Sequence, residues 1–463
     1  MRSERRRQRL TGAPDAPEPD AMKTRVLFAC LLLGATLARA DDAVDRFVTE
    51  YIAKKQVPGV ALLVRIQGKT VLARGYGLAN LEHRIPVKPE TVFQSGSMGK
   101  QFSAMGVMML ADEGKLALDD PVGKYLEVPE SWKGITLRHL LTHTSGLGDY
   151  PEDFSLQKDY SEDDLWKMIT AQPLASAPGE KWKYSNLGYV TLGILIHKVS
   201  GRFYGDLLRE RIFTPLGMSR TRIISERDLV PDRAAGYVLK DGALQNQEWV
   251  APTLNTTADG SLYFTVEDLA KWDAALEARR LASPAMYGEM WTPVRLNGGS
   301  TADYGFGWSL HTLPSGHHVI EHGGAWQGFA TYIARYPEEQ LTVVALGNRA
   351  GADVRYIAHV VAGHYRPELA PVKHHAVKLP AAALARYAGE YRLDERATLT
   401  VVVTGDRLVA TFQGDKRELF PESESDFFEE DSDRGYHVER DPSDAVTSLT
   451  LSVPEKLVFR KVK

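Results

Sequence analysis

Segments with strand character lie on both sides of a long helical stretch. The early runs Val60–Ile66 and Thr70–Tyr76 are apolar or alternating and flank a turn. Similar runs return at Phe329–Tyr336 and Leu341–Leu346, whereas most of Leu116–Met290 has a helical pattern. These positions predict one antiparallel sheet assembled from both sides of the stretch, with helices on its faces and a helical lobe inserted between its strands.

The length of the chain and a change of pattern near its end predict two folded domains. The 463 residues exceed what one ordinary hydrophobic core accommodates. We predict a main domain over 41–365 and a Pro-bearing linker over 366–380, after an N-terminal extension and signal peptide over 1–40. Residues 381–463 carry short alternating runs, such as Thr398–Val403, and predict a small all-β domain.

The apolar run Val26–Leu37 has the features of an export signal. Lys23 and Arg25 precede it, and the small-x-small pattern Ala38–Arg39–Ala40 follows it. We therefore predict that the mature chain begins at Asp41 and is exported to the periplasm or the extracellular space.

Three alternatives stay open at this end of the chain. A short membrane anchor is one, although the apolar run is short for a stable membrane span. A lipoprotein signal at Cys30 is another, and Met22 rather than Met1 is a possible start. Cys30 is the one cysteine of the chain, so an intramolecular disulfide and a Cys-based zinc site are excluded.

The charge balance excludes one class of partner. Lys and Arg number 56, Asp and Glu number 60, and the formal net charge is -4. A chain with this balance has no overall basic character, so we do not expect it to bind nucleic acid. The sequence leaves the oligomeric state open.

The segment Ser97-Met98-Gly99-Lys100 places a nucleophile beside a base. We predict that Ser97 is the first residue of a helix that continues through the apolar run Phe102–Ala111. Ser97 and Lys100 would then share one helix face. A helix N-terminus also offers free N–H groups and a positive dipole end. The pattern suits acyl-enzyme formation, although a capping serine beside a solvated lysine has the same sequence.

A second motif, Tyr184-Ser185-Asn186, comes just before the predicted helix Asn186–Ser200. One interpretation is a packed tyrosine followed by a capping asparagine. The other is catalytic: a tyrosine close to Lys100 can relay a proton, because a nearby cation lowers its pKa. Asn186 could then hold the amide or ester of a bound substrate.

A third motif, His322-Gly323-Gly324, follows a strand-like run. Glycines at such a position leave room for another backbone to lie along the strand edge. An ordinary Gly-rich strand end is the alternative. The three motifs together, in this order and each on the element that it needs, favour a functional interpretation.

With these motifs, the chain resembles the serine β-lactamase and D-Ala-D-Ala peptidase superfamily. It is most similar to the cephalosporinase-like branch, which includes class C enzymes, family VIII esterases and D-aminopeptidases. The resemblance covers residues 42–363, and the tail resembles lipocalin-like β-barrels. It implies an α/β (α+β) fold: an antiparallel five-stranded sheet flanked by helices, with an inserted all-helical lobe, plus a small C-terminal β-barrel domain.

The resemblance also implies catalytic roles. Ser97 attacks a carbonyl, and Lys100 takes its proton directly or through Tyr184, which later protonates the leaving group. The backbone N–H groups of Ser97 and Ala325 form the oxyanion hole. No metal or organic cofactor is implied. The residues implied in substrate binding are Asn186, His322, Gly323 and Gly324.

His322 stands where the family motif Lys-Thr-Gly has its lysine. An imidazole is mostly neutral at pH 7 and gains a proton near pH 6.5. We therefore expect weak recognition of substrate carboxylates, improving below that pH. The resulting prediction is an exported serine hydrolase that acts on ester, amide or peptide bonds of a small molecule or peptide. A weak β-lactamase, or a penicillin-binding, slowly deacylating sensor or cell-wall-binding protein, is the alternative.

Overall fold

The computed structural model describes residues 39–393, 397–412, 415–452 and 457–462. The chain separates into two compact units, Met1–Phe47 and Val48–Lys463. Of the first unit, residues 39–47 are described and are helical. The export-signal run Val26–Leu37 lies outside the described residues.

The main sheet has seven antiparallel strands. Five strands were expected; the additional ones are short edge strands, too brief to show a repeating pattern. As predicted, strands from both sides of the inserted region pair directly, since β14 lies beside β1. In spatial order the strands are β11 (Ser309–Thr312), β12 (His318–Trp326), β13 (Phe329–Tyr336), β14 (Leu341–Gly347), β1 (Gly59–Ile66), β2 (Lys69–Asn80) and β3 (Ile85–Pro86).

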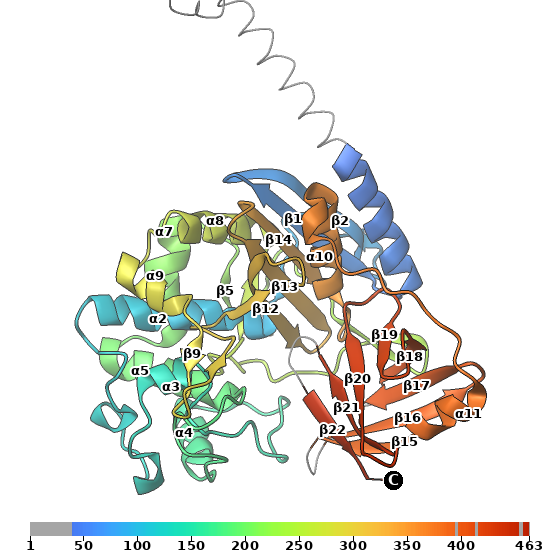
Figure 1. Ribbon diagram of the computed structural model, residues 1–463. Coiled ribbons are helices and arrows are strands. Elements are labelled where there is room, and N and C mark those ends of the chain that lie inside the picture. The colour runs from blue at the N-terminus through green and yellow to red at the C-terminus, as the bar shows by residue number, and fades with distance from the viewer. Residues whose placement is uncertain (1–38, 394–396, 413–414, 453–456, 463) are drawn as a thin grey trace, which may run out of the picture. The chain divides into compact units, whose positions relative to one another are not determined.

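Helices cover both faces of this sheet, which explains why β1, β13 and β14 are buried throughout. On β13, Arg335 contacts α8 (Val266–Glu277) through Asp273, whereas Tyr332 contacts α10 (Val354–Tyr365) through Arg355. Positions an odd number apart on a strand point to opposite faces. The two helices therefore lie on opposite sides of the sheet, with α10 in front in Figure 1.

The region between β3 and β11 is not all-helical as expected. Its short strands have two to four residues, too few to show alternation in the sequence. They are β4 (Phe93–Gln94), β5 (Arg222–Ile223), β6 (Tyr237–Lys240), β7 (Ala243–Asn246), β8 (Leu262–Phe264), β9 (Val294–Arg295) and β10 (Thr301–Ala302). Besides α8, its α-helices are α2 (Lys100–Asp112), α3 (Leu137–Leu141), α4 (Glu162–Thr170), α5 (Asn186–Ser200), α6 (Tyr204–Leu208), α7 (Thr214–Leu216) and α9 (Pro284–Met290).

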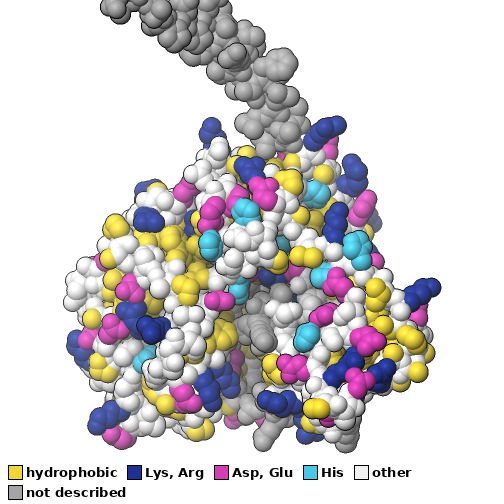
Figure 2. Space-filling view, viewed as in Figure 1, with side chains coloured by type: hydrophobic (Ala, Val, Ile, Leu, Met, Phe, Trp, Pro, Cys, Tyr) yellow, Lys and Arg dark blue, Asp and Glu magenta, His cyan; other side chains and the backbone are white. Residues whose placement is uncertain are grey.

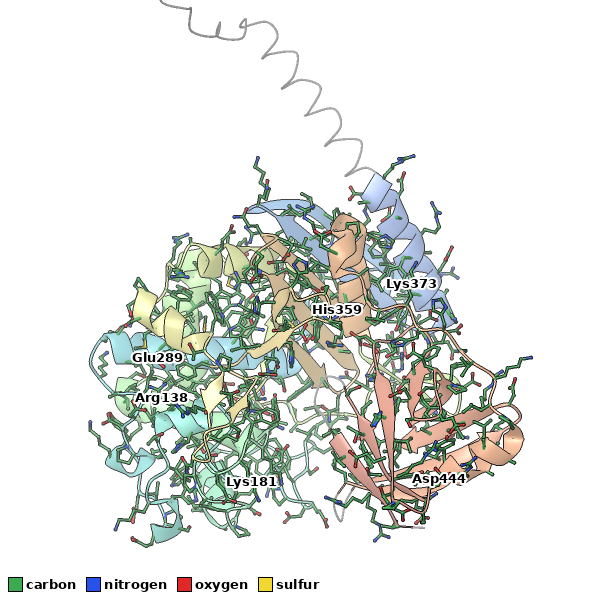
Figure 3. The ribbon with its side chains drawn as sticks, in the orientation of Figure 1. Arg138, Lys181, Glu289, His359, Lys373 and Asp444 are labelled. Atoms are coloured by element: carbon green, nitrogen blue, oxygen red, sulfur yellow. The ribbon has the colours of Figure 1, made fainter. Side chains whose placement is uncertain are left out.

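Local sequence signals account for several helix boundaries. Thr136 caps α3 and Thr265 caps α8, each through its side chain. Helix α5 ends at the left-handed Gly201, where φ is 70°. Between α3 and α9, Arg138 and Glu289 form an ion pair of 2.5 Å, and Figure 3 labels both residues.

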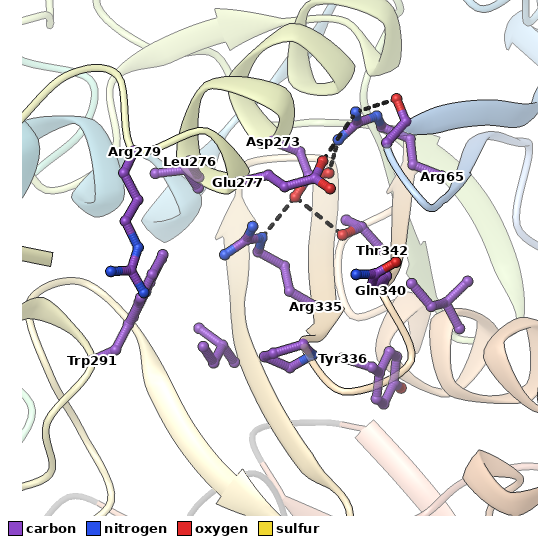
Figure 4. A pocket seen from close by; sticks show the side chains of 14 residues that line it. Arg65, Asp273, Leu276, Glu277, Arg279, Trp291, Arg335, Tyr336, Gln340 and Thr342 are labelled. Atoms are coloured by element: carbon purple, nitrogen blue, oxygen red, sulfur yellow. Dashed lines mark hydrogen bonds and ion pairs between the residues drawn. The ribbon is translucent and has the colours of Figure 1, made fainter. Parts of the chain in front are cut away.

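A buried carboxylate holds α8 against the sheet (Figure 4). Asp273 forms an ion pair with Arg65 of β1, accepts from Arg335 Nε at 2.6 Å and accepts from Thr342 Oγ1 at 3.0 Å. The carboxylate is therefore fully engaged by three strands, as a buried charge has to be.

The tail is a closed eight-stranded barrel, which confirms the predicted small β-domain. The barrel closes where β15 pairs with β22, and its interior is apolar, with Leu408 and Leu449 fully buried. Helix α11 (Ala381–Leu384) precedes it. The strands are β15 (Gly389–Arg392), β16 (Thr398–Thr404), β17 (Arg407–Phe412), β18 (Asp415–Pro421), β19 (Asp426–Glu429), β20 (Gly435–Arg440), β21 (Val446–Leu451) and β22 (Leu457–Lys461).

Charged side chains of both signs are interspersed on the face drawn in Figure 2, in keeping with the near-balanced composition. Within the described ranges, none of the helices combines the length and the apolar character that a membrane span requires.

Candidate active site

Ser97 lies in a tight 3₁₀ turn, Gly96–Gly99, rather than in the first turn of an α-helix, and α2 begins at Lys100. The turn is held from below by Ser95, whose Oγ donates to Gly260 O at 2.7 Å. Thr331 Oγ1 of β13 donates to Ser95 O, also at 2.7 Å. The predicted helix start is therefore wrong, but the two side chains still meet, since Lys100 Nζ lies 3.0 Å from Ser97 Oγ.

Lys100 is fully buried, with no exposed surface. Its Nζ donates to Ser97 Oγ, to Asn186 Oδ1 at 2.7 Å and to Asp259 O at 2.9 Å. Burial lowers the pKa of Lys100 to about 8, while Asp259 and Asp149 act in the opposite direction. A lysine in this state can exist as a neutral base at moderately alkaline pH, which solvated lysines do not.

The second motif lies beside this amine. Lys100 Nζ sits 4.8 Å from the centre of the Tyr184 ring. Ser185, not Asn186, caps α5, since its Oγ accepts from Gly188 N. The Asn186 side chain is thereby available to the site: Oδ1 accepts from Lys100, and Nδ2 donates to both carboxylate oxygens of Asp149 at 3.1 Å.

His143 supports the tyrosine. Its ring centre lies 4.2 Å from that of Tyr184, with the two planes tilted by 34°, and its Nδ1 accepts from Ser185 N at 3.1 Å. Burial and the positive charge of Lys100 hold its pKa well below the usual range. A neutral imidazole therefore fixes the backbone of the second motif.

The third motif lies on β12, but its histidine differs from our expectation. His322 is buried, its Nδ1 lies 2.6 Å from Gly323 O and its Nε2 lies 2.9 Å from Tyr304 Oη. A carbonyl only accepts, so Nδ1 carries the proton and Nε2 accepts from the tyrosine. Burial, and secondarily Lys100, lower the pKa of His322 to about 4. The expected gain of a proton near pH 6.5 is therefore wrong.

The glycines allow β12 to approach the nucleophile turn. A Cβ on Gly324 would lie 2.1 Å from Ser95 O and 3.0 Å from Met98 N, so no larger residue fits. Gly96, at φ 51°, packs as closely against Ala325, where an added Cβ would come within 2.5 Å of Ala325 N. Gly324 is thus required for packing, whereas the sequence suggested only room for substrate.

One edge of β12 is open beside Ser97. β11 pairs with β12 only from His318 to Glu321. The segment His322–Trp326 pairs with β13 alone among the described strands. This arrangement leaves the backbone of Ala325 available beside Ser97, as an oxyanion hole requires.

Two cavities meet at the nucleophile. One, of about 840 Å³, is lined by Ser97, Asn186 and Asp259 among others. The other, of about 380 Å³, is lined by Ser97, Tyr184 and His322 among others. Among the residues that the structure describes, no group of three or more His, Cys, Asp or Glu side chains is placed to hold a metal ion.

Two acidic residues of this site were missed in the sequence. Asp149 lies 37 positions from Asn186, and Asp259 lies 159 positions from Lys100, so folding brings each to its partner and neither belongs to a spacing pattern. Asp259 precedes Gly260, whose backbone packs against Gly96. That contact is not visible in local sequence.

Similarity to known proteins identifies the family of the chain. The beta-lactamase family matches residues 44–365, and a domain of unknown function (DUF3471) matches residues 373–462. A penicillin-binding protein of Bacillus subtilis (strain 168) is 32% identical over 402 residues, which cover 81% of this chain and 88% of that protein. A D-aminopeptidase of Gluconobacter oxydans (strain 621H) is 28% identical, over 67% of this chain and 60% of that protein.

A solved structure has a similar fold. The octameric penicillin-binding protein homologue from Pyrococcus abyssi matches with a TM-score of 0.65 and 27% identity, covering 90% of this chain and 99% of its own. The chain therefore belongs to the beta-lactamase family and is a serine hydrolase of the β-lactamase and penicillin-binding protein superfamily.

Proposed function

We propose that the protein hydrolyses ester, amide or peptide bonds through an acyl-enzyme at Ser97. The observation that carries the proposal is the 3.0 Å contact between Ser97 Oγ and Lys100 Nζ, in which the amine is buried and its pKa is lowered to about 8. Roughly a tenth of the lysine is neutral at pH 7, enough to act as a general base.

The reaction follows from these positions. Ser97 Oγ attacks the carbonyl carbon while its proton passes to Lys100, directly or through Tyr184. The negative charge that develops on the carbonyl oxygen is stabilised by the N–H groups of Ser97 and Ala325, each worth about 3 kcal/mol. Tyr184 returns a proton to the leaving group, and the acyl-enzyme is then hydrolysed by water.

Because His322 is neutral, we expect substrates that place no carboxylate at the third motif. Its two ring nitrogens are engaged by Gly323 and Tyr304, so it supplies neither a charge nor a spare N–H. The name D-aminopeptidase of one relative supports amide and peptide bonds as targets. Another relative is named a penicillin-binding protein, which supports a second candidate function: acylation by a β-lactam followed by slow deacylation.

Export is part of the proposal. The apolar run Val26–Leu37 and the pattern Ala38–Arg39–Ala40 support cleavage before Asp41. Mass spectrometry of the mature N-terminus after expression of the full chain should find Asp41 first. An uncut chain retained in the cytoplasm would contradict export.

A panel of chromogenic substrates tests the activity. Purified protein is assayed with nitrophenyl esters, amino-acid nitroanilides and a chromogenic cephalosporin, with Ser97→Ala as the control. We expect turnover of esters or amides, and a fluorophosphonate adduct on Ser97 in peptide maps. An adduct on another residue, or equal rates in Ser97→Ala, would refute the mechanism. A lasting penicillin adduct without turnover of any substrate would favour the second candidate.

A further inference from the structure

A further cavity lies where α8 packs on the sheet (Figure 4). Its volume is about 270 Å³, and it shares no lining residue with the two cavities that meet at Ser97. Among its described lining residues, three guanidinium groups stand against two carboxylates, so the wall carries one net positive charge. These charged residues are Arg65, Arg279, Arg335, Asp273 and Glu277. The chemistry at Ser97 makes no use of this cavity.

Arg335 presents the unpaired end of its guanidinium group to this space. The side chain is only 11% exposed, and its Nε donates to Asp273 Oδ1 at 2.6 Å. Within the ranges that the structure describes, neither Nη atom has a hydrogen-bond partner in the protein. Figure 4 shows this guanidinium group directed toward the side on which Arg279 and Trp291 lie. A nearly buried cation whose N–H groups have no protein acceptor is well placed to bind an anion.

Arg279 adds a second cation of the same kind. It lies just after α8 in a left-handed conformation, with φ at 48°. Its side chain forms no hydrogen bond or ion pair with any residue that the structure describes. Burial raises the pKa of Tyr287, and Arg335 and Arg279 both act against that rise, so both guanidinium groups lie near this hydroxyl. The two cations therefore converge on one side of the cavity.

Apolar side chains form much of the remaining wall. Leu276 of α8, Ile320 of β12 and Leu341 of β14 line the cavity together with Trp291. The centre of the Trp291 ring lies 5.3 Å from Arg335 Cζ, a cation–π contact that holds the guanidinium group in place. A pocket with apolar walls and a few convergent polar groups suits an organic molecule rather than a bare inorganic ion.

We propose that this cavity binds a small organic monoanion, a carboxylate with an apolar body, through Arg335 and Arg279. A carboxylate accepts two parallel N–H bonds from a guanidinium group and matches its planar shape. Its single charge equals the net charge of the wall, whereas a phosphate monoester brings about two. The volume lies just below the range of pockets that hold drug-sized ligands, so it suits a body of one aromatic ring. The proposal is independent of the hydrolase function proposed above.

Calorimetry with phenylacetate and its neutral analogue phenylacetamide tests the site. The two molecules have the same size, so a difference in affinity reports the charge. Measured in Ser97→Ala, which cannot turn over a ligand, phenylacetate should bind with a Kd of about 1 mM or tighter. Phenylacetamide should bind at least about tenfold more weakly, because it cannot form charge-assisted hydrogen bonds through an anionic oxygen.

Arg279→Gln locates the binding. Arg279 is exposed and lacks a protein partner, so its replacement does not endanger the fold. Added to Ser97→Ala, it should weaken phenylacetate about tenfold and leave phenylacetamide unchanged. Arg280→Gln is the matched control, since Arg280 is the neighbouring exposed arginine and does not line the cavity. The proposal is wrong if phenylacetate does not bind, if acid and amide bind equally, or if the two variants behave alike. Inorganic phosphate binding as tightly as phenylacetate would overturn the assignment to organic carboxylates.

The pH dependence of binding separates this cavity from the site at Ser97. Arginine stays protonated, and the described lining residues include no histidine or lysine. The affinity for phenylacetate should therefore stay constant between about pH 6 and 9. A ligand beside Lys100, whose pKa is about 8, would instead lose affinity as the pH rises through that value. A loss of affinity with a midpoint near 8 would place the ligand at Ser97 and refute the assignment to this cavity.

Discussion

Asn186 Oδ1 lies 2.7 Å from Lys100 Nζ, closer than the 3.0 Å that separates this amine from the nucleophile Ser97. The two residues belong to α5 and α2, 86 positions apart. Asn186 is itself anchored by Asp149 through its amide nitrogen. The orientation of the base therefore depends on a side chain from another helix, which a carboxylate of a third segment holds in place.

Asn186→Asp tests this dependence. A carboxylate in place of the amide oxygen would face Lys100 at hydrogen-bond distance and raise its pKa by direct attraction. Activity on a neutral ester at pH 7 should fall about tenfold and recover as the pH rises. Asn186→Ala, which adds no charge, should lower the rate without moving the pH profile upward. If the pH–rate profiles of the two variants coincide, the added charge does not act on the pKa of Lys100.

The pH profile of wild type should reflect Lys100. Since the base is active only when neutral, kcat/KM for a neutral ester should rise with pH through about 8. Asp149 raises the pKa of Lys100, so Asp149→Asn should move the rising part of the pH profile to lower pH. Asp153, an exposed carboxylate nearby in the sequence, has no such effect on Lys100, so Asp153→Asn should leave the profile unchanged. Lys100→Arg, which stays protonated, should be inactive across the range. The measurement is the initial rate between pH 5.5 and 9.5, at roughly constant ionic strength.

His322→Lys should favour substrates that carry a carboxylate. A lysine cation near a carboxylate is worth roughly 1 to 4 kcal/mol between bulk water and a protein surface, whereas the neutral imidazole gives little. The ratio of kcat/KM for a chromogenic cephalosporin to that for an ester should rise at least about tenfold, with His322→Gln as the neutral control. An unchanged ratio would mean that residue 322 does not face the substrate carboxylate.

In wild type the same ratio should stay flat as the pH is lowered through 6.5. Burial keeps the pKa of His322 at about 4, so the imidazole remains neutral over this interval. A ratio that rises with a midpoint near 6.5 would show that this histidine is accessible to solvent protons after all.

Gly324→Ala should impair catalysis more than Gly323→Ala. The new methyl group at position 324 would lie 2.1 Å from Ser95 O, a backbone atom of the nucleophile turn that cannot give way easily. At position 323 it would meet the Tyr332 ring at 3.1 Å, which is tight but adjustable. We expect at least a tenfold larger loss of kcat for Gly324→Ala, about 1.4 kcal/mol in barrier height. Similar losses in both variants would contradict this packing role.

Asp273→Asn should destabilise the main domain. Its carboxylate is paired with Arg65 and Arg335 in the buried cluster of Figure 4. The variant removes this shared anion and leaves Arg65 only its longer ion pair with the exposed Glu277, at 3.5 Å. The free energy of unfolding in urea should drop by roughly 3 kcal/mol or more. Lys133→Gln is the control, because its ion pair with Glu130 is exposed and should matter by less than about 1 kcal/mol. A small effect of Asp273→Asn would mean that the cluster relaxes or admits water.

Local patterns in the sequence identified much of the fold and the candidate residues. Helix α5 occupies the predicted range Asn186–Ser200, and the threonines that cap α3 and α8 are residues with a known preference for that position. Periodicity and capping depend on residues within one or two turns, so a single sequence contains them. Strands of two to four residues hold too few positions for any period, and the inserted region was therefore read as all-helical.

The sequence by itself determined that Ser97 and Lys100 would be close, because side chains three residues apart lie on one side of an α-helical or a 3₁₀ turn, and the structure has them in contact. Tertiary structure alone decided what surrounds them. Asp259, 159 positions from Lys100, reaches the amine only because Gly260 and Gly96 let two backbones touch. Charge, burial and hydrogen bonding at a site are sums over neighbours in space, and long-range packing selects those neighbours independently of any local spacing.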